Sequence, residues 1–483
     1  MKQLSGIDAS FLYMETPETP MHVAGFNIYE LPEGFKGSFH KHFTEFFAGR
    51  VHLVSIFNVK LAKAVFELDH PGWVDAGPLD FDHHIKSAKL PALASFADLE
   101  AMVADLHSQP LDLKKPLWQF TVIEGLKNNQ VAIYSKVHHA LVDGGAGMEI
   151  TQALFDLGPI PREVKPPEPK PKKRVPTKTE RAILGVHDMA ANVVRQNLTF
   201  MEAIPQAMGQ MAGLATSAAT GKLGLPQLMA PKTPFNGSIG QKRSYCARTI
   251  SLMDVKAIGK ASGTKVNDVV MAICSGALRN YLNDKHQLPD ASLTAFVPIS
   301  TRTSGKSSSN NQVFGMNCPL ATNYSDPLKR LQKIHAETGA SKTIAGSVQD
   351  ISPKDFTLVG APTLLPAMMS MYGKTGLADI LPNAVNVTIS NTAGPPFPMF
   401  CAGAKLLSLY PVSIPIHGIG LNLTVQSYLD HLDFGLTADY ASVPDLADLG
   451  DLLVKSFEEL RDVVLGPPAK PAPKRKPSTK KQS

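Results

Sequence analysis

The pattern of apolar and polar positions divides the chain into short segments of two kinds. Alternation with a period of two is typical of half-buried strands and predicts strands at 23–31, 117–125 and 131–137. Apolar residues at helical spacing predict helices at 39–54, 96–107 and 145–157. Hairpins are expected at 64–74, around Pro71-Gly72, and at Asn128-Asn129, between the last two strands.

The second half of the chain continues this mixture. A helical pattern rich in Ala and Met at 180–220 precedes strands predicted at 245–252, 293–300 and 385–389, and a meander of strands at 406–437. Helices are predicted at 269–282 and 443–465. Strands and helices intermix without a strict strand–helix–strand rhythm, which favours an α/β fold with mixed sheets flanked by helices.

A Pro- and Lys-rich segment at 159–179 separates the two halves. It contains too many prolines for a helix or a central strand, and such segments form extended spacers. A spacer of about 20 residues is uncommon inside one compact domain. We therefore expect an N-terminal domain at 1–158, this linker, a C-terminal domain at 180–466, and a basic, disordered tail at 467–483.

The 483 residues carry a formal net charge of +6, which invites a nucleic-acid-binding interpretation. The excess lies in two segments, because 467–483 has six basic and no acidic residues and 161–178 has seven basic and two acidic residues. The remainder carries a formal charge of −5, so no nucleic-acid partner is expected. A Lys or Arg near an anionic lipid surface contributes about 1 kcal/mol, so the tail keeps a peripheral membrane role open.

Cysteine usage and hydropathy indicate a cytoplasmic chain. The four cysteines lie 28, 44 and 83 residues apart, which fits neither a metal motif nor a redox motif. Acidic residues interrupt the N-terminal segment where a signal peptide would be apolar. Residues 406–429 lack Asp, Glu, Lys and Arg, but their prolines and glycines suit buried strands better than a spanning helix. Attachment to the inner membrane or to lipid inclusions would be peripheral.

The string YSKVHHALVDGGAG at 134–147 is the strongest candidate for chemistry. His138 and His139 end a predicted strand, and side chains alternate along a strand, so the two imidazoles should point to opposite faces. His139 continues the more apolar face, where a neutral histidine can act as a general base. The opposed directions argue against both rings binding one metal. Asp143-Gly144 could be turn chemistry, and a structural role for the whole string stays open.

Other motifs disfavour other chemistries. A second histidine pair, His83-His84, has no following Asp-Gly and is interpreted as structural. The string at 236–240 lacks the first glycine of a hydrolase nucleophile elbow. The sequence has no P-loop, zinc-protease or dinucleotide-binding motif, so no metal or cofactor is expected. A histidine base without a neighbouring nucleophile suits direct transfer between two substrates, with no covalent acyl-enzyme.

Several separate strings resemble one family. The HHxxxDG motif at 138–144 resembles that of the CoA-dependent acyltransferase superfamily, and the finer resemblance is to the bacterial wax ester synthase/acyl-CoA:diacylglycerol acyltransferase family. The supporting strings follow in the family's order: PMHV at 20–23, PLW at 116–118, ND at 267–268, VPISTR at 297–302 and NVTISNTAGP at 386–395. The last string departs from the family's pattern, because Thr392-Ala393 replaces Val-Pro before Gly394.

The resemblance implies a two-domain fold like that of chloramphenicol acetyltransferase, with an active-site tunnel between the domains. It also implies transfer of a fatty acyl group from acyl-CoA, a substrate rather than a cofactor, to a long-chain alcohol or to diacylglycerol. His139 would remove the hydroxyl proton, and CoA would leave as thiolate. The products would be wax ester or triacylglycerol, which are neutral storage lipids.

Further residues receive candidate roles from the resemblance and the local pattern. His138 would help to place His139 or the substrate. Asn267 would donate to the oxyanion or act as scaffold, with helix N-capping as the alternative. Asp143 would orient its loop through Arg302, with a loose surface pair as the alternative. The remaining candidates are Gly144 and Asp268 for support of the site, and Ser390, Asn391, Pro116 and Trp118 for substrate binding, with turn structure or packing as the alternative.

Two other functions remain as alternatives. A condensation-type transferase would use carrier-protein thioesters, but the PMHV, PLW and ND strings disfavour it. A catalytically silent lipid-surface binding protein would not need a base in a closed loop. The intact string at 138–144 therefore disfavours the second alternative.

Overall fold

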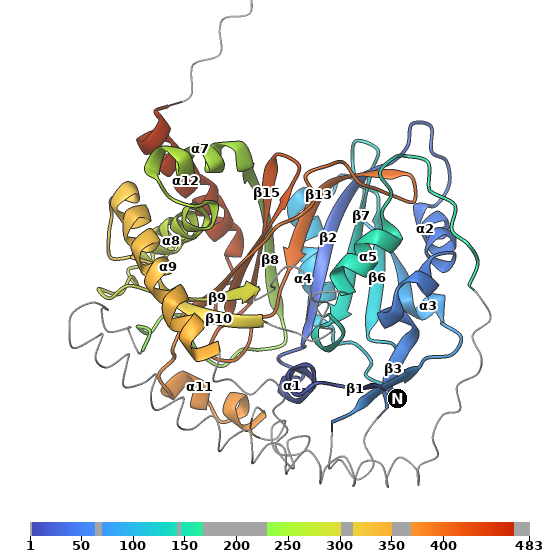
Figure 1. Cartoon of the computed structure of the whole chain (residues 1–483), viewed down its shortest axis with the longest axis horizontal. Coiled ribbons are helices and arrows are strands. Elements are labelled where there is room, and N and C mark those ends of the chain that lie inside the picture. Colours follow the sequence, from blue (N-terminus) through green and yellow to red (C-terminus); the bar gives the residue numbers. More distant parts are fainter. Residues whose placement is uncertain are drawn as a thin grey trace, which may run out of the picture.

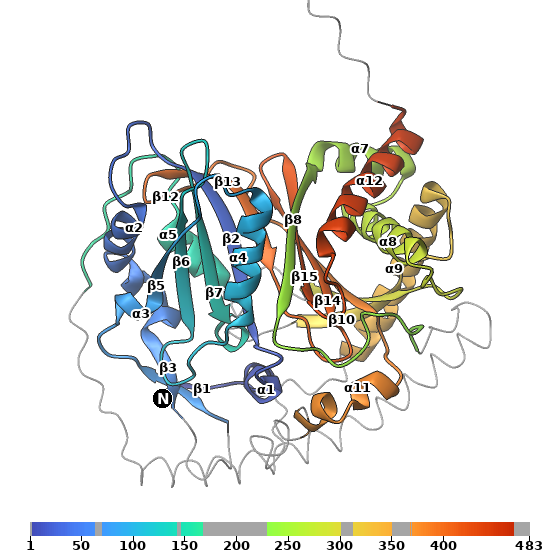
Figure 2. The same cartoon turned by 180° about the vertical axis from the view of Figure 1, so that it is seen from behind.

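The computed structural model describes residues 2–62, 70–142, 146–167, 229–300, 313–349, 368 and 370–467. Two six-stranded sheets dominate these residues and lie side by side with helices around them (Figures 1 and 2). The linker beyond residue 167, the helix expected at 180–220 and the tail from residue 468 lie outside the described residues, so what the sequence predicts for them stays a prediction.

The first sheet is mixed. Its neighbouring strands are antiparallel except β5 and β6, which run parallel. Helices α4 (Phe96–Ser108) and α5 (Ala146–Leu154) lie on its opposite faces, and α2 (Phe39–Ala48) packs near its β5 edge (Figures 1 and 2). The order of its strands is β12 (Phe400–Cys401), β13 (Ala404–Val412), β2 (His22–Glu30), β7 (Gln130–His138), β6 (Trp118–Glu124) and β5 (Ile85–Lys89).

The second sheet is also mixed, because β11 runs parallel to both of its neighbours, β9 and β14. Its order is β10 (Val313–Pro319), β9 (Thr294–Ser300), β11 (Val387–Thr392), β14 (Leu421–Tyr428), β15 (His431–Asp439) and β8 (Arg243–Ser251). The helices on the side away from the first sheet are α7 (Leu252–Ser262), α8 (Val266–Asp284), α9 (Pro327–Gln349) and α12 (Leu446–Leu465) (Figure 1). The predicted α/β architecture of mixed sheets flanked by helices is confirmed.

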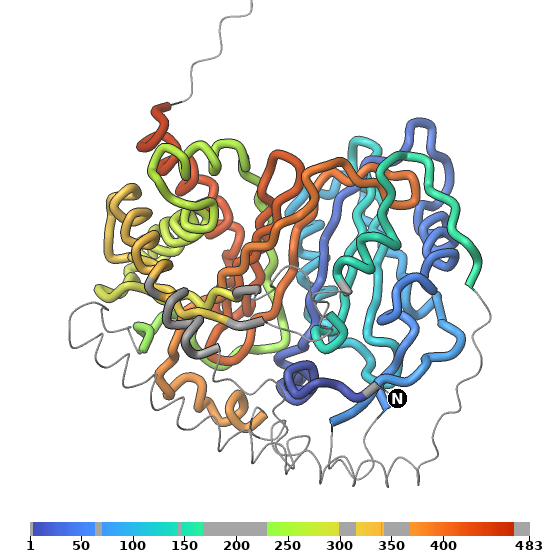
Figure 3. Tube along the Cα trace, viewed as in Figure 1, coloured from blue at the N-terminus to red at the C-terminus, as the bar shows by residue number. Residues whose placement is uncertain are grey.

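Shorter elements complete the fold. They are the small sheet β1 (Lys2–Gln3), β4 (Gly72–Asp75) and β3 (Val59–Ala62), the helices α1 (Gly6–Met14), α3 (Phe81–His84) and α11 (Leu377–Ile380), and the 3-10 turns Val51–Leu53, Ser55–Asn58 and His139–Leu141. The chain trace in Figure 3 places α1 beside the end of β2 that carries His22. Within the described ranges, no helix combines the length and the apolar character needed to cross a membrane.

Local patterns predicted most of these elements. The hairpin at Asn128-Asn129 is confirmed: it joins antiparallel β6 and β7, and both asparagines have left-handed φ angles of 60° and 56°. Asparagine tolerates that conformation better than most residues. Of the hairpin expected at 64–74, residues 63–69 lie outside the described residues, and β3 and β4 flank them as an antiparallel pair.

The helix expected at 39–54 is shorter than predicted. Helix α2 ends at Ala48, and Gly49, which has low helix propensity, follows it. The next residues form 3-10 turns, where the Asn58 amide donates to the carbonyl oxygens of Val51 and Val54 at 2.8 and 2.9 Å. These bonds satisfy backbone acceptors that a continuous helix would otherwise have used.

The prediction of a meander at 406–437 is wrong for its first strand. β14 and β15 form the antiparallel hairpin, but β13 pairs with β2 and so joins the first sheet (Figure 1). Its buried Ala404 and Leu406 pack into the apolar core of that sheet. Hydrogen-bond partners of a strand are not visible in its own periodicity, so the sequence could not show this crossing.

The second histidine pair, His83-His84, ends the single-turn helix α3. His84 is buried, its Nδ1 lies 2.8 Å from the Trp118 carbonyl oxygen, and its ring stacks on that indole at 4.1 Å. These contacts agree with the structural role that we predicted.

Buried carboxylates join the two sheets. The Oε1 of Glu100, on α4, accepts hydrogen bonds from the Ala247 N–H at 2.7 Å and from Arg248 at 3.0 Å. Asp433, on β15, accepts from the Leu409 N–H of β13 at 2.7 Å. Both carboxylates are less than 10% exposed, and such charge-assisted bonds have strict geometry. They therefore fix how the two sheets lie against each other.

Candidate active site

His139 lies where β7 ends. The strand ends at His138, and His139 begins a 3-10 turn of three residues. The His139 N–H donates to the Met21 carbonyl oxygen at 2.8 Å, which extends the β2–β7 pairing beyond His22 and His138. Its ring stacks on Phe11 of α1, with ring centroids 3.9 Å apart. The PMHV string and α1 therefore hold the histidine from two sides.

Burial controls the protonation of His139. The pKa of this imidazole is lowered from 6.5 to about 4, chiefly by burial; the residue's own backbone carbonyl opposes the shift, and the nearby His138 adds to it. The Nδ1 atom is buried without a hydrogen-bond partner among the described residues. The ring is therefore neutral at neutral pH, which is the form that accepts a proton.

His138 contacts different residues from those around His139. It is fully buried, and its Nε2 lies 2.6 Å from the Glu15 carboxylate. Its Nδ1 accepts the Ala140 N–H at 3.1 Å. In the neutral ring the proton must then be on Nε2, where it is donated to Glu15. This tautomer leaves His138 with both nitrogens in structural bonds.

The strand alternates as predicted up to these histidines. Lys136, on the His138 side, is buried and donates to the carbonyl oxygens of Leu106 and Gln109 at the end of α4, at 3.1 and 2.7 Å. Burial lowers the pKa of Lys136 to about 8, with Glu15 opposing. On the opposite face, Ile133, Ser135 and Val137 line a cavity instead. The two faces of the strand thus have different chemistry.

His22 of the PMHV string belongs to the same buried layer. Its Nε2 lies 3.0 Å from the His107 carbonyl oxygen, and the His107 ring contacts the Tyr134 hydroxyl at 2.8 Å and the Ser413 carbonyl oxygen at 2.8 Å. Burial lowers the pKa of His107 to about 3 and that of His22 well below its usual value. Both histidines are therefore neutral and make structural hydrogen bonds, which agrees with a local structural role for the PMHV string.

Phe11 and Glu15 were not predicted from the sequence. Both belong to α1 or to its C-terminal cap, and they contact the two histidines of the motif. The signal in the sequence is weak, because Glu15 is one of the acidic residues that interrupt the N-terminal segment and matches no site motif. A helix that touches residues more than 120 positions away leaves no local trace in its own sequence.

Asp143, Gly144 and Arg302 lie outside the described residues. The predicted pair between Asp143 and Arg302, and the supporting role of Gly144, stay predictions.

The fold brings the ND string at 267–268 next to the string NVTISNTAGP at 386–395. Asn267 Oδ1 accepts from the Asn391 Nδ2 at 3.4 Å. Helix α8 begins at Val266, so Asn267 lies in its first turn and the N-capping alternative for it is wrong. Asp268 caps instead, because its carboxylate accepts the Lys265 N–H at 3.0 Å.

Asp268 also supports this corner of the second half. It is 1% exposed, and its Oδ2 lies 2.6 Å from the Nδ1 of His335 on α9. Ser390 is half-buried on β11, opposite Thr424 of β14. The roles of Asn267, Ser390 and Asn391 in catalysis or substrate binding stay predictions.

The loop after Asn391 is tightly packed although it lacks the family's proline. The Gly394 N–H donates to Ser427 Oγ at 3.0 Å, and a Cβ at Gly394 would lie only 2.0 Å from the Ser427 carbonyl oxygen. The following Pro395 lines the cavity. The glycine is therefore required by a close approach of two backbone segments.

Trp118 lies in an aromatic core rather than at an open surface. It is fully buried, its indole N–H donates to the Phe57 carbonyl oxygen at 3.0 Å, and it packs on Phe47. Pro116 accepts the Trp118 N–H at 2.9 Å just before β6. These contacts are those of the packing alternative, whereas Phe120, two residues further on, lines the cavity.

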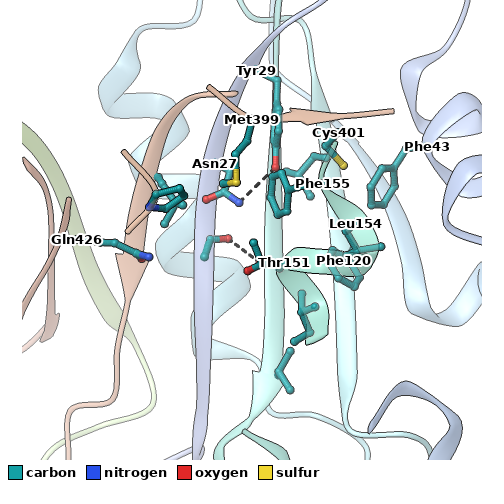
Figure 4. A pocket seen from close by; sticks show the side chains of 17 residues that line it. Asn27, Tyr29, Phe43, Phe120, Thr151, Leu154, Phe155, Met399, Cys401 and Gln426 are labelled. Atoms are coloured by element: carbon teal, nitrogen blue, oxygen red, sulfur yellow. Dashed lines mark hydrogen bonds between the residues drawn. The ribbon is translucent and has the colours of Figure 1, made fainter. Parts of the chain in front are cut away.

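A cavity of about 200 Å³ lies between the first sheet, α5 and the loops of the second half (Figure 4). On β7 it is lined by Ile133, Ser135 and Val137; His139 follows two residues after Val137 and is not itself among the lining residues. From the second half it is lined by Pro395, Met399, Cys401, Leu409 and Gln426. Most of the lining is apolar, which suits an aliphatic ligand.

The cavity residues Gly25, Asn27 and Tyr29 on β2 were not predicted as site residues. The period-two pattern at 23–31 places them on one face, so the sequence contained a signal for their shared direction. It gave no reason to expect that this face borders a cavity.

Among the described residues, no group of three or more His, Cys, Asp or Glu side chains is arranged to hold a metal ion. The four cysteines are buried thiols, and burial raises the pKa of Cys401 and Cys274 to about 12 and that of Cys318 to about 11.

Two family models match the chain. The wax ester synthase/diacylglycerol acyltransferase catalytic domain matches residues 4–270, and the WS/DGAT C-terminal domain matches residues 309–461. The chain belongs to the wax ester synthase/diacylglycerol acyltransferase family. It is an acyltransferase, as its motifs predicted.

Relatives and solved structures agree with this membership. Two proteins of Mycobacterium tuberculosis H37Rv named as diacylglycerol O-acyltransferases are 31% identical over 461 residues and 34% identical over 469 residues; each alignment covers 95% of this chain, and 98% and 100% of the relatives. The wax ester synthase/diacylglycerol acyltransferase from Marinobacter aquaeolei VT8 is 29% identical with a TM-score of 0.68, over 96% of this chain and 99% of that one. A starter condensation domain of rhizomide synthetase, 13% identical with a TM-score of 0.55 over 96% and 94% of the two chains, shares the fold alone.

Proposed function

We propose that the chain transfers a fatty acyl group from acyl-CoA to the hydroxyl group of a long-chain alcohol or of diacylglycerol. The names of the relatives and of the Marinobacter enzyme support these acceptors. The observation that carries the proposal is the state of His139: it is a neutral imidazole at the end of β7, with its Nδ1 unpaired among the described residues.

The reaction needs one group that accepts and returns a proton. A nitrogen of neutral His139 takes the proton of the acceptor hydroxyl while its oxygen attacks the thioester carbonyl carbon. A C–O bond forms, and the carbonyl π electrons move to oxygen. When this tetrahedral intermediate collapses, the C–S bond breaks and the CoA sulfur receives the proton from His139. A general base of this kind contributes about 10²–10⁴-fold to the rate.

In this proposal other residues place the base and stabilise the intermediate. His138 positions the turn that carries His139 through its bonds to Glu15 and Ala140. Asn267, bonded to Asn391 at 3.4 Å, keeps a candidate role as oxyanion donor or scaffold.

The cavity beside β7 is proposed to hold the aliphatic chain of one substrate. Its lining is mostly apolar, and burial of an apolar chain releases about 0.8 kcal/mol per methylene group. Since β7 connects the cavity to His139, a chain bound along the strand would present its reacting end to the base.

Release of the CoA thiol from palmitoyl-CoA, with and without hexadecanol, tests the proposal. We expect release that depends on the alcohol and falls by at least about 10²-fold in His139→Ala. His83→Ala is a matched control, because His83 is a partly exposed member of the other histidine pair. An unchanged rate in His139→Ala would reject the assigned base, and loss of activity in both variants would point to a general effect on folding.

We also infer peripheral attachment to membranes or lipid inclusions through the basic residues at 467–483. The six cations without acidic neighbours support it.

A further inference from the structure

One polar atom inside the mostly apolar cavity has no partner among the described residues. Asn27, on β2, is 8% exposed, and its buried Oδ1 accepts no hydrogen bond from that part of the chain. Its Nδ2 donates to the Tyr29 hydroxyl at 3.3 Å. A dashed line marks this bond in Figure 4. Most buried polar atoms are paired, and an unpaired one costs stability that a ligand can recover.

The surroundings of Asn27 form a small polar niche, which we define as Gly25, Asn27 and Ser135. A Cβ at Gly25 would lie 3.5 Å from Asn27 Oδ1 and 3.1 Å from Ser135 Oγ, so the missing side chain leaves space between these two oxygens. Ser135 donates to the Gly25 carbonyl oxygen at 3.2 Å, so its Oγ can still accept a hydrogen bond. All three residues line the cavity.

The niche suits a hydroxyl group. Asn27 Oδ1 and Ser135 Oγ both need a donor. The Tyr29 hydroxyl accepts from Asn27, so its own proton is available to a ligand oxygen. A hydroxyl both donates and accepts, and it is small and neutral enough for a cavity that is otherwise apolar.

The niche lies at a defined distance from the base. Gly25 is opposite Ser135, and Asn27 is opposite Ile133, in the β2–β7 pairing. These positions precede His139 by four to six residues, which is roughly 13–20 Å along a strand. An aliphatic chain that starts at His139 and follows β7 would therefore pass the niche in its middle part, far from its reacting end.

We infer that the cavity selects a long aliphatic chain that carries a mid-chain hydroxyl group, and that Asn27 is the residue that determines this preference. The inference rests on the proposed acyl transfer. The same chemistry can come from the acyl group of the CoA thioester or from the alcohol that accepts it. A plain chain would leave Asn27 Oδ1 unpaired beside methylene groups, whereas a hydroxylated chain would pair it.

Two matched pairs of substrates test the inference. Ricinoleoyl-CoA and oleoyl-CoA, each with hexadecanol, differ by one mid-chain hydroxyl in the donor. Ricinoleyl alcohol and oleyl alcohol, each with palmitoyl-CoA, differ in the same way in the acceptor. We expect kcat/KM to favour the hydroxylated member about tenfold in one of the two pairs, and Asn27→Leu to bring that ratio to about one. The pair that responds identifies which substrate occupies the cavity.

The ratio of two substrates in one preparation does not depend on how much of a variant is folded. Tyr29→Phe, which removes only the hydroxyl, should reduce the ratio as well. Thr151→Val is the matched control: Thr151 lines the cavity, but its hydroxyl already donates to the Gly147 carbonyl oxygen at 2.8 Å, so its loss should leave the ratio unchanged. A ratio near one in both pairs for the unmodified chain, or a preference that survives Asn27→Leu, would overturn the inference. If none of these substrates reacted, the proposed function itself would fail.

Discussion

At the scale of single residues, different contact partners give two adjacent histidines different properties. His138 has both ring nitrogens in hydrogen bonds, to Glu15 and to the Ala140 N–H. His139 stacks on Phe11, and its buried Nδ1 has no hydrogen-bond partner in the described part of the chain. His138 thus has a structural role, whereas His139 is a candidate base. Their different contacts with α1 and its cap distinguish the two residues.

The pH dependence of the reaction should report the state of His139. Burial lowers its pKa to about 4, so the neutral base persists as the pH falls and is lost only when the pH passes through that value. We expect kcat/KM to stay constant between neutral pH and about pH 5 and to decrease below it. A decrease centred near 6.5, the usual pKa of histidine, would contradict the burial seen around this ring.

Phe11→Ala should move this acidic limb. Removing the stacked ring admits water, which stabilises the protonated imidazole, so the limb should shift upward by about one pH unit. Phe96→Ala is a matched control, because Phe96 is an exposed aromatic residue on α4. A profile that Phe11→Ala leaves in place would mean that its ring does not control hydration of His139.

At the scale of elements, β13 is the strand that connects the two sheets. Its backbone pairs with β2, while its Pro411 carbonyl oxygen approaches Gly435 of β15 so closely that a Cβ there would lie 1.7 Å away. The Tyr245 hydroxyl donates to the same oxygen at 3.3 Å. The crossing of β13 over β15 therefore requires a residue without a side chain.

Gly435→Ala should accordingly destabilise the chain. The added methyl group forces β13 and β15 apart, and overpacking of this kind typically costs about 1–3 kcal/mol. Chemical denaturation monitored by circular dichroism measures the free energy of unfolding. Gly339→Ala, at an exposed position of α9 where a Cβ meets nothing within 4 Å, is the control and should not destabilise. Equal effects of both variants would reject the crossing as a tight contact.

At the scale of the whole molecule, charge is distributed unevenly along the sequence. The basic residues concentrate in 161–178 and 467–483, and the remainder has a formal charge of −5. Attraction to an anionic surface would therefore come from these segments and weaken with salt.

Binding to vesicles tests this distribution. Deletion of 467–483 should weaken binding to anionic vesicles by up to about 1 kcal/mol for each lost cation and leave binding to neutral vesicles unaffected. The matched variant keeps the length and replaces the basic residues by glutamine: Lys470, Lys474, Arg475, Lys476, Lys480 and Lys481. Co-sedimentation measures the affinity. Unaltered binding of both variants would show that the tail does not attach the protein to anionic membranes.

The predictions that succeeded depended on local information. Periodicity identified β2, β6 and β7, and the turn at Asn128-Asn129, because side-chain direction and turn propensity are properties of neighbouring residues. The prediction that failed depended on a distant partner, because β13 pairs with β2 instead of with the strands that follow it in the sequence.

The sequence alone determined the class of fold, the family and the histidine motif, since periodic patterns and ordered motifs persist without knowledge of contacts. Only the tertiary structure decided that α1 contacts both histidines and that β13 joins the first sheet. It also decided that Asn27 faces a cavity with an oxygen that no described residue pairs. The physical reason is that burial, strand pairing and hydrogen-bond partners depend on contacts between residues far apart in the chain. A sequence pattern shows only which face of its own helix or strand each side chain occupies.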